Sequence, residues 1–122
     1  MKKVLVVDDS PTIRQQIGRA LTEAGFEVIE ATDGVDGIDK IAADKGIGIV
    51  ILDINMPRMN GLEMLEKVKQ HADSGHLPVI MLTSEGQKSM IERAKRAGAK
   101  GWIVKPFKSE LLVGAVRKLI AA

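Results

Sequence analysis

Short aliphatic runs that end in polar residues recur along the chain. Four of them are almost unbroken and cover residues 3–7, 48–53, 79–82 and 101–104. The first three end in charged or turn-forming residues, which is typical of strands buried on both faces, and residues 101–104 are the last predicted strand. A fifth segment, residues 26–30, alternates apolar with polar positions, which favours a less buried strand at the edge of a sheet. The hydrophobic pattern therefore predicts five strands.

Apolar residues at helical spacing fill the segments between and after these strands. Ser10 and Pro11 predict the first helix, as an N-cap followed by proline at the first helical position, and Gly25 predicts its end. The spacing predicts further helices over residues 35–42, 62–68, 87–97 and 111–120. The Asp33-Gly34 pair predicts a turn before the second of these helices. Strands that alternate with helices predict one α/β domain over residues 1–122, a doubly wound parallel sheet with helices on both faces.

The composition is that of an ordinary globular protein. Hydrophobic residues make up 45% of the chain and charged residues 28%, which argues against disorder and against membrane insertion. No apolar run has the length of a membrane span or of a secretory signal, so we expect a cytoplasmic protein with no membrane partner. The absence of cysteine excludes disulfides, thiolate zinc sites and cysteine nucleophiles. Any chemistry must therefore use oxygen and nitrogen groups.

Basic charge is concentrated in the last third of the chain. Residues 86–122 hold 9 of the 18 basic side chains but 2 of the 16 acidic ones. Such a block is either a solvated surface or a docking face for an acidic partner. It lacks interleaved aromatic residues and a helix-turn-helix, so we expect no nucleic-acid binding. No glycine-rich phosphate loop follows the first strand, which argues against a nucleotide-binding fold.

Polar side chains stand at the carboxyl ends of four predicted strands. They are Asp8, Asp9, Asp53, Thr83 and Lys105. Ligands of open parallel sheets bind at this edge, so we expect these residues to share one site. Three neighbouring carboxylates repel one another and require a cation, for which Mg²⁺ is suited. Lys105 and Thr83 suit the oxygens of a phosphoryl group, and Asp53 is the candidate nucleophile. Taken alone, the strand that ends in Asp53 does not exclude the alternative that Asp53 simply caps the loop that follows.

Four segments are distinctive when they are considered together. They are VVDDSPTIR at 6–14, ILDINMPRMNG at 51–61, MLTSE at 81–85 and KPF at 105–107. The chain that carries them resembles the receiver domains of two-component response regulators, in particular the single-domain, CheY-like members. The resemblance covers essentially the whole chain and implies a flavodoxin-like sheet with strand order 2-1-3-4-5. It also implies a sensor histidine kinase as the phosphoryl donor.

The resemblance implies a role for each acidic residue of the site. Asp53 is the expected phosphoacceptor. Asp9 is expected to bind Mg²⁺ directly and Asp8 to act through a water molecule. Asn55 is expected to offer its backbone carbonyl oxygen to the metal.

The resemblance also implies how the phosphoryl group is bound and how long it persists. Thr83 and Lys105 are expected to bind its oxygens, and the peptide bond before Pro106 is expected to be cis. Three side chains are expected to tune the lifetime of the phosphorylated state, namely Ile54, Asn55 and Glu85.

One residue departs from the family pattern. Receiver domains usually have Tyr or Phe three residues before the lysine, and this chain has Trp102. In the family, the counterpart of Thr83 moves toward the phosphoryl group and the aromatic ring moves into the space released. Trp is larger, so we expect the inward position of Trp102 to be harder to reach. The alternative is a Trp that is simply half-buried on an edge strand.

The expected function is a phosphorylation-controlled switch that catalyses only its own phosphorylation and dephosphorylation. Because no effector domain is evident, we expect a monomer that signals by binding a downstream protein through its basic last third, as in chemotaxis. A phosphorelay intermediate or a phosphate sink would have the same sequence features. A Mg²⁺-dependent aspartyl phosphohydrolase is disfavoured, because such enzymes usually present Asp-x-Asp where this chain has adjacent Asp8 and Asp9. Retention of the pocket groups argues against a scaffold that never takes phosphate.

Overall fold

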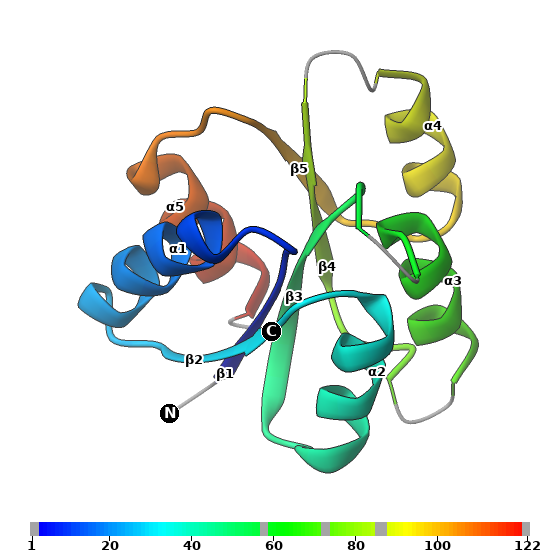
Figure 1. The fold of residues 1–122 in the computed structure, drawn as a ribbon, viewed down its shortest axis with the longest axis horizontal. Helices are drawn as coiled ribbons and strands as arrows, with labels where there is room; N and C mark the ends of the chain where they lie inside the picture. The colour runs from blue at the N-terminus through cyan, green and yellow to red at the C-terminus, as the bar shows by residue number, and fades with distance from the viewer. Residues whose placement is uncertain (1–2, 57–58, 72–73, 85–87, 121–122) are drawn as a thin grey trace.

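The computed structural model describes residues 3–56, 59–71, 74–84 and 88–120 (Figure 1). A five-stranded parallel sheet in the order β2-β1-β3-β4-β5 forms its centre. The strands are β1 (Lys3–Val7), β2 (Glu27–Ala31), β3 (Ile47–Asp53), β4 (Val79–Thr83) and β5 (Gly101–Val104). The strand order and the parallel pairing confirm the predicted fold.

Helices cover both faces of the sheet (Figure 1). They are α1 (Pro11–Glu23), α2 (Gly34–Ala43), α3 (Gly61–Gln70), α4 (Lys88–Arg96) and α5 (Ser109–Ile120). Apolar side chains of α1 and α5 form one core with the sheet, and those of α2, α3 and α4 form a second core on the opposite face. Val4 and Val6 belong to the first core and Leu5 and Val7 to the second, because successive side chains of a strand point to opposite faces.

Burial along the strands follows the hydrophobic pattern. Every residue of β3 except Gly48 is buried, and every residue of β4 is buried. By contrast, β2 lies at the edge of the sheet, where Glu27 and Glu30 are exposed. The sequence therefore predicted both the central strands and an edge strand correctly. Among the described side chains of α4, Ala94 is the buried one, which agrees with the weak apolar stripe of that helix.

The start of β2 differs from the prediction. The sequence pattern placed Phe26 in the strand, but its N–H donates to the Leu21 carbonyl oxygen at 3.0 Å and so completes the end of α1. Gly25 permits this because its φ is +96°, a conformation that favours glycine after a helix. The strand therefore begins at Glu27.

The Asp33-Gly34 pair also has a different role from the predicted turn. Asp33 is the N-cap of α2, and its carboxylate accepts a hydrogen bond from the Asp36 N–H at 2.9 Å. Ser10 caps α1 as predicted, accepting from the Ile13 N–H at 3.3 Å. A short polar side chain before a helix can satisfy a free N–H in this way. Both helices that follow β1 and β2 therefore begin at side-chain caps.

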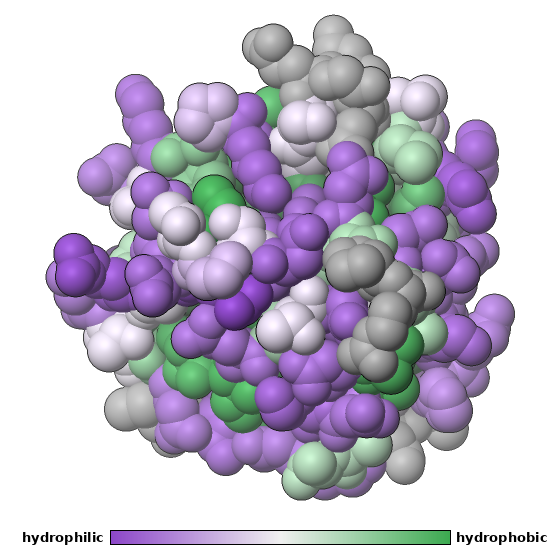
Figure 2. Space-filling model, in the orientation of Figure 1, coloured by the Kyte–Doolittle hydropathy of each residue, from purple (hydrophilic) through white to green (hydrophobic). Residues whose placement is uncertain are grey.

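Hydrophilic side chains cover most of the face shown in Figure 2, and hydrophobic ones lie in small separate groups. Within the described part of the chain, no helix has the length and apolar character needed to cross a membrane. The large hydrophobic side chains exposed among these residues are Trp102 (38%), Val104 (41%) and Leu111 (62%). They belong to β5 and the first turn of α5, so this apolar surface falls within the basic last third.

The first residue of α3 packs directly on the end of β3. The Gly61 N–H donates to the Ile54 carbonyl oxygen at 2.8 Å. A Cβ at position 61 would clash with the backbone carbonyl oxygen of Asp53 and lie 2.8 Å from the Ile54 Cα. Both neighbours are backbone atoms and cannot rotate away. Gly61 is therefore required for the close approach of α3 to the strand that ends in Asp53.

We expect Gly61→Ala to lower the free energy of unfolding by about 1–3 kcal/mol, the usual cost of overpacking. Gly114→Ala is the matched control, because Gly114 lies in α5 and a Cβ there meets nothing within 4 Å. The control should raise the free energy of unfolding by about 0.5–1 kcal/mol through helix propensity. Urea denaturation of both variants measures the contrast. Equal effects of the two substitutions would show that position 61 is not crowded.

Candidate functional site

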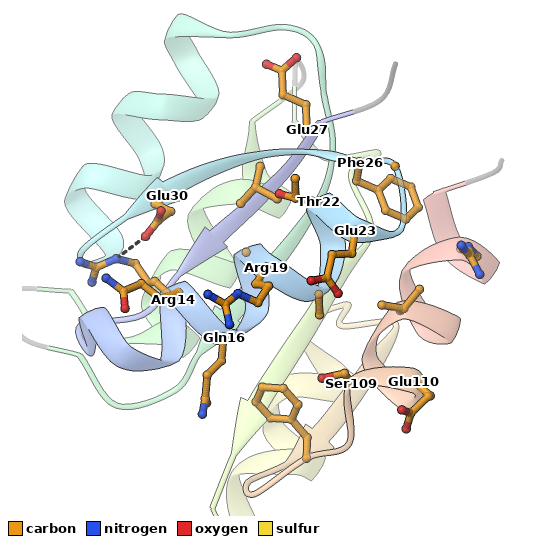
Figure 3. A pocket seen from close by; sticks show the side chains of 18 of the residues that line it. Arg14, Gln16, Arg19, Thr22, Glu23, Phe26, Glu27, Glu30, Ser109 and Glu110 are labelled. Carbon is orange, nitrogen blue, oxygen red and sulfur yellow. Dashed lines mark hydrogen bonds and ion pairs between the residues drawn. The ribbon is translucent and has the colours of Figure 1, made fainter.

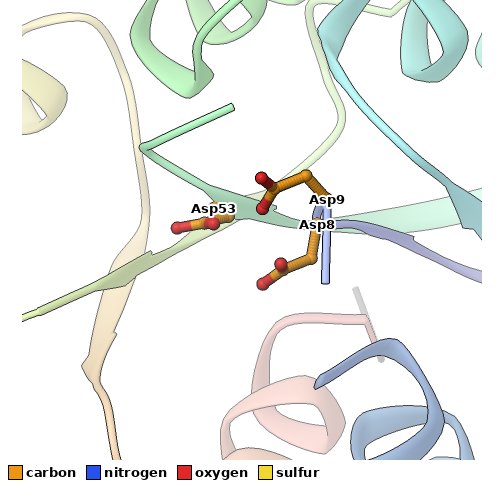
Figure 4. A group of neighbouring side chains, drawn as sticks. All are labelled: Asp8, Asp9 and Asp53. Carbon is orange, nitrogen blue, oxygen red and sulfur yellow. The ribbon is translucent and has the colours of Figure 1, made fainter. Parts of the chain in front are cut away.

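Three carboxylates meet at the carboxyl edge of the sheet (Figure 4). Asp8 and Asp9 follow β1, and Asp53 is the last residue of β3. One oxygen atom from each carboxylate lies within 4.8 Å of the other two. Asp8 and Asp53 are buried, whereas Asp9 is exposed. The structure thus brings together the acidic residues that the sequence placed at two strand ends.

The buried Asp8 carboxylate is held by donors on both of its oxygens. The Ser10 N–H donates to Oδ1 at 2.9 Å, and the Lys105 ammonium donates to Oδ2 at 3.1 Å. Asp8 is therefore fixed in direction and placed to pair with the cation of Lys105.

Lys105 provides the positive charge opposite the acidic cluster. Its Nζ lies 3.1 Å from Asp8 Oδ2 and 3.4 Å from Asp53 Oδ2. Burial alone would lower the pKa of this ammonium, but the charges of Asp53 and Asp8 outweigh burial and raise it. The Lys105 N–H donates to the Thr83 carbonyl oxygen at 2.7 Å, which fixes the backbone. The peptide bond between Lys105 and Pro106 is cis, as predicted.

The environment of Asp53 disfavours its ionised form. Burial, together with the nearby charge of Asp8, raises the pKa of Asp53 to about 6, although Lys105 and a backbone hydrogen bond from Asn55 act in the opposite direction. A buried carboxyl group with a raised pKa beside charged partners is a typical functional-site residue. At neutral pH, Asp53 is nevertheless mostly ionised and can act as a nucleophile.

Thr83 ends β4 with a buried hydroxyl group. Among the described residues, its Oγ1 is the buried side-chain polar atom without a hydrogen-bond partner. A buried hydroxyl without a partner is costly, so such a group deserves a functional explanation. Because β4 lies next to β3, with Leu82 paired to Asp53, Thr83 is one residue beyond the level of the acidic cluster. Its unpaired hydroxyl is therefore a candidate hydrogen-bond donor at that edge.

The remaining predicted residues lie in different environments. Asn55 is exposed directly after β3, whereas Ile54 is 1% exposed and packs in the core beneath α2 and α3. Glu85 lies outside the described residues. Trp102 is on β5, and the Nζ of Lys95 lies 4.5 Å from the centroid of its ring.

Two residues that the sequence did not single out contact the backbone of the site. Gly61 packs against Asp53, as described above, and the Nη1 of Arg14 donates to the Asp8 carbonyl oxygen at 2.6 Å. A weak signal for Arg14 was present, because it lies one turn into α1 and helical side chains lean toward the N-terminus, here toward Asp8.

The family of the chain follows from comparison with known proteins. Residues 4–117 match the response regulator receiver domain, so this chain belongs to the response regulator receiver family. Receiver domains act between a histidine kinase and downstream targets. A member of this family is a phosphoacceptor signalling protein.

Comparison with individual proteins shows which kind of response regulator this chain is. The chain is 42% identical over 111 residues to the chemotaxis protein CheY1 of Helicobacter pylori, and the match covers 90% of each chain. It is 38% identical to the structure of CheY4 from Vibrio cholerae, with a TM-score of 0.91 over 98% of both chains. The receiver domain of NtrX from Brucella abortus has a TM-score of 0.91 at 30% identity, again over 98% of both chains. This chain is therefore a two-component response regulator of the chemotaxis type.

The acidic cluster fits the metal that receiver domains generally use, Mg²⁺. Its donors, Asp8, Asp9 and Asp53, are all carboxylate oxygens. Hard cations such as Mg²⁺ prefer oxygen donors and are bound by one or two carboxylates together with water and phosphate oxygens. The group of three could therefore hold one such ion.

The raised pKa of Asp53 predicts a pH-dependent effect of Asp53→Asn on stability. Because the folded protein holds the Asp53 proton more tightly than the unfolded chain, protonation stabilises the fold below about pH 4, and this contribution is lost as the pH rises through about 6. In metal-free buffer at pH 7.5, we expect Asp53→Asn to raise the free energy of unfolding by on the order of 1–3 kcal/mol. The difference should shrink toward pH 4.

Asp44→Asn is the control of opposite sign. The Asp44 carboxylate accepts a hydrogen bond from Lys3 and another from the Gly46 N–H, and both lower its pKa. Ionised Asp44 therefore stabilises the fold, so the control variant should be less stable than the wild type at pH 7.5. Urea denaturation between pH 4 and 8 measures both profiles. If Asp53→Asn also destabilises the protein at pH 7.5, ionisation of Asp53 does not strain the fold.

Proposed function

We propose that Asp53 is the residue that accepts the phosphoryl group. The observation that carries this proposal is the meeting of the Asp53 carboxylate with the Lys105 ammonium and the other two carboxylates at one sheet edge. An oxygen of ionised Asp53 attacks the phosphorus of a phosphohistidine on the kinase. The new bond joins that oxygen to phosphorus, the bond between nitrogen and phosphorus breaks, and the imidazole leaves with a proton.

Protein side chains bind the phosphoryl oxygens in this proposal. The Lys105 ammonium already lies beside Asp53 and supplies a compact positive charge. The buried Thr83 hydroxyl, which has no partner of its own, donates a hydrogen bond to another oxygen. These contacts stabilise the charge of the transferring group and are lost on its hydrolysis.

Four groups would hold Mg²⁺ at this site. Asp9, Asp53 and the Asn55 backbone carbonyl would bind it directly, and Asp8 would do so through water. The ion supplies positive charge that neutralises the phosphoryl oxygens during transfer. The buried Asp8, which is fixed by Ser10 and Lys105, supports the less direct role. The exposure of Asp9 supports direct binding of an ion that arrives from solvent.

The phosphorylated domain signals by binding another protein in this proposal. The basic last third, with Trp102, Val104 and Leu111 exposed, offers a surface for that partner. The similarity to the chemotaxis protein CheY1 supports an output in chemotaxis. Trp102 takes the place of the switch aromatic, and the side chains at three positions tune the lifetime of the phosphoryl group, namely Ile54, Asn55 and Glu85. The chain acts as a single receiver domain, a monomer that catalyses its own phosphorylation and dephosphorylation.

Intact mass spectrometry after incubation with Mg²⁺ and a small acyl phosphate tests the proposal. We expect one phosphoryl group per wild-type molecule, and none in Asp53→Ala or in the presence of a chelator. Asp39→Ala, an exposed carboxylate on α2, is the matched control and should be labelled like the wild type.

Two other outcomes would contradict the proposal. Labelling of Asp53→Ala would place the phosphoryl group elsewhere. Release of free phosphate without an adduct, measured in parallel, would favour a phosphohydrolase over a switch.

A further inference from the structure

Arg14 of α1 links the Asp8 backbone to the neighbouring strand. Its Nη1 donates to the Asp8 carbonyl oxygen at 2.6 Å. Its Nε donates to Glu30 Oε1 on β2 at 3.0 Å, the contact that Figure 3 marks with a dashed line. The Arg14 side chain is 14% exposed, whereas that of Glu30 is 48% exposed. Two nitrogen atoms of one planar group therefore serve two different acceptors.

The contact between Arg14 and Asp8 lies in the peptide unit that joins two of the site's carboxylate residues, Asp8 and Asp9. The Asp8 N–H is already fixed by the Ala31 carbonyl oxygen at 3.2 Å, and the Asp8 side chain is held by Ser10 and Lys105. The Asp8 carbonyl belongs to the peptide unit that leads into Asp9. Arg14 therefore orients the peptide from which the exposed Asp9 carboxylate projects toward Asp53.

A surface ion pair alone would not explain this arrangement. An ion pair with a half-exposed partner such as Glu30 contributes little to stability. A guanidinium, by contrast, has donors in a rigid fork, which a lysine ammonium cannot reproduce. The fork allows Glu30 to fix the orientation of Arg14 while Arg14 holds the Asp8 carbonyl.

We propose that Arg14 is a positioning residue for the Mg²⁺ site, and that Glu30 acts through Arg14. This proposal rests on the proposed function, in which Asp9 and Asp53 bind the ion. Outer groups that orient metal ligands typically change metal affinity by 10- to 100-fold when they are removed.

Electrostatics and positioning predict opposite signs for the loss of Arg14. Removing a positive charge close to the acidic cluster would, by charge alone, strengthen binding of a cation. Loss of positioning would weaken binding, because the ion must then order the Asp9 peptide itself. A weakened affinity therefore cannot come from the change in charge.

Isothermal titration of MgCl₂ into each metal-free protein tests the proposal. We expect Arg14→Gln to raise the Kd by about tenfold. Arg19→Gln is the matched control, with the same substitution at an exposed position of the same helix, and should leave the Kd within about twofold of the wild type. Arg14→Lys keeps the charge but not the fork, so its Kd should lie between those of wild type and Arg14→Gln.

Glu30 is tested by a double-mutant cycle. Glu30→Gln should weaken Mg²⁺ binding in the wild-type background more than in Arg14→Gln, because Glu30 acts through Arg14. Glu27→Gln, the same change at the other end of β2, is its control. Circular dichroism and urea denaturation without Mg²⁺ confirm that every variant is folded.

The outcomes separate this proposal from the proposed function. If the wild type binds Mg²⁺ and Arg14→Gln binds it equally or more tightly, Arg14 does not position the site, and the proposed function stands. An equal rise in Kd for Arg19→Gln would also overturn the positioning role. If the wild type itself does not bind Mg²⁺, both proposals are overturned.

Discussion

The repulsion between three carboxylates at one sheet edge is the constraint on which the site depends. The backbone brings Asp8, Asp9 and Asp53 together at the ends of two adjacent strands, where one oxygen of each lies within 4.8 Å of the others. Lys105, which follows the edge strand β5, offsets part of this repulsion through contacts with Asp8 and Asp53. For Asp53, burial is the largest cause of the raised pKa, and the charge of Asp8 adds to it. Further positive charge would stabilise this arrangement, and a bound cation such as Mg²⁺ would supply it.

The rest of the fold holds these groups in place against their repulsion. Two hydrophobic cores, one on each face, fix the central strands, and β3 is buried along almost its whole length. At the end of β3, Gly61 lets α3 pack directly on the Asp53 backbone. At the end of β1, Asp8 is held by Arg14 of α1 and by the N–H of Ser10, the N-cap of that helix. The acidic groups therefore project from backbone that is fixed at both strand ends.

Sequence reasoning predicted what depends on local pattern. Aliphatic runs identified the central strands, because a strand buried on both faces must be apolar along its length. The polar residues that follow these runs identified the site, because the carboxyl ends of parallel strands lie at the same edge of the sheet. It failed at one strand boundary and at contacts between distant segments. Phe26 looked like strand, but its N–H completes the cap of α1. The contacts of Arg14 with Glu30, and of Gly61 with Asp53, depend on tertiary packing that no hydrophobic period encodes.

Trp102 is the site residue that departs from the family pattern, which usually has Tyr or Phe at this position. In the register of the sheet, Trp102 pairs with Met81 and Thr83 with Val104, so Trp102 and Thr83 lie on the same face, two residues apart along neighbouring strands. A movement of the Thr83 side chain would therefore occur on the same face of the sheet as the indole, one strand away. In the proposed switch, an inward movement of the ring would break its contact with Lys95, at a cost of about 0.5–1 kcal/mol for an exposed site. Because the indole is also larger than a phenyl ring, we expect its size and its contact with Lys95 both to oppose that movement.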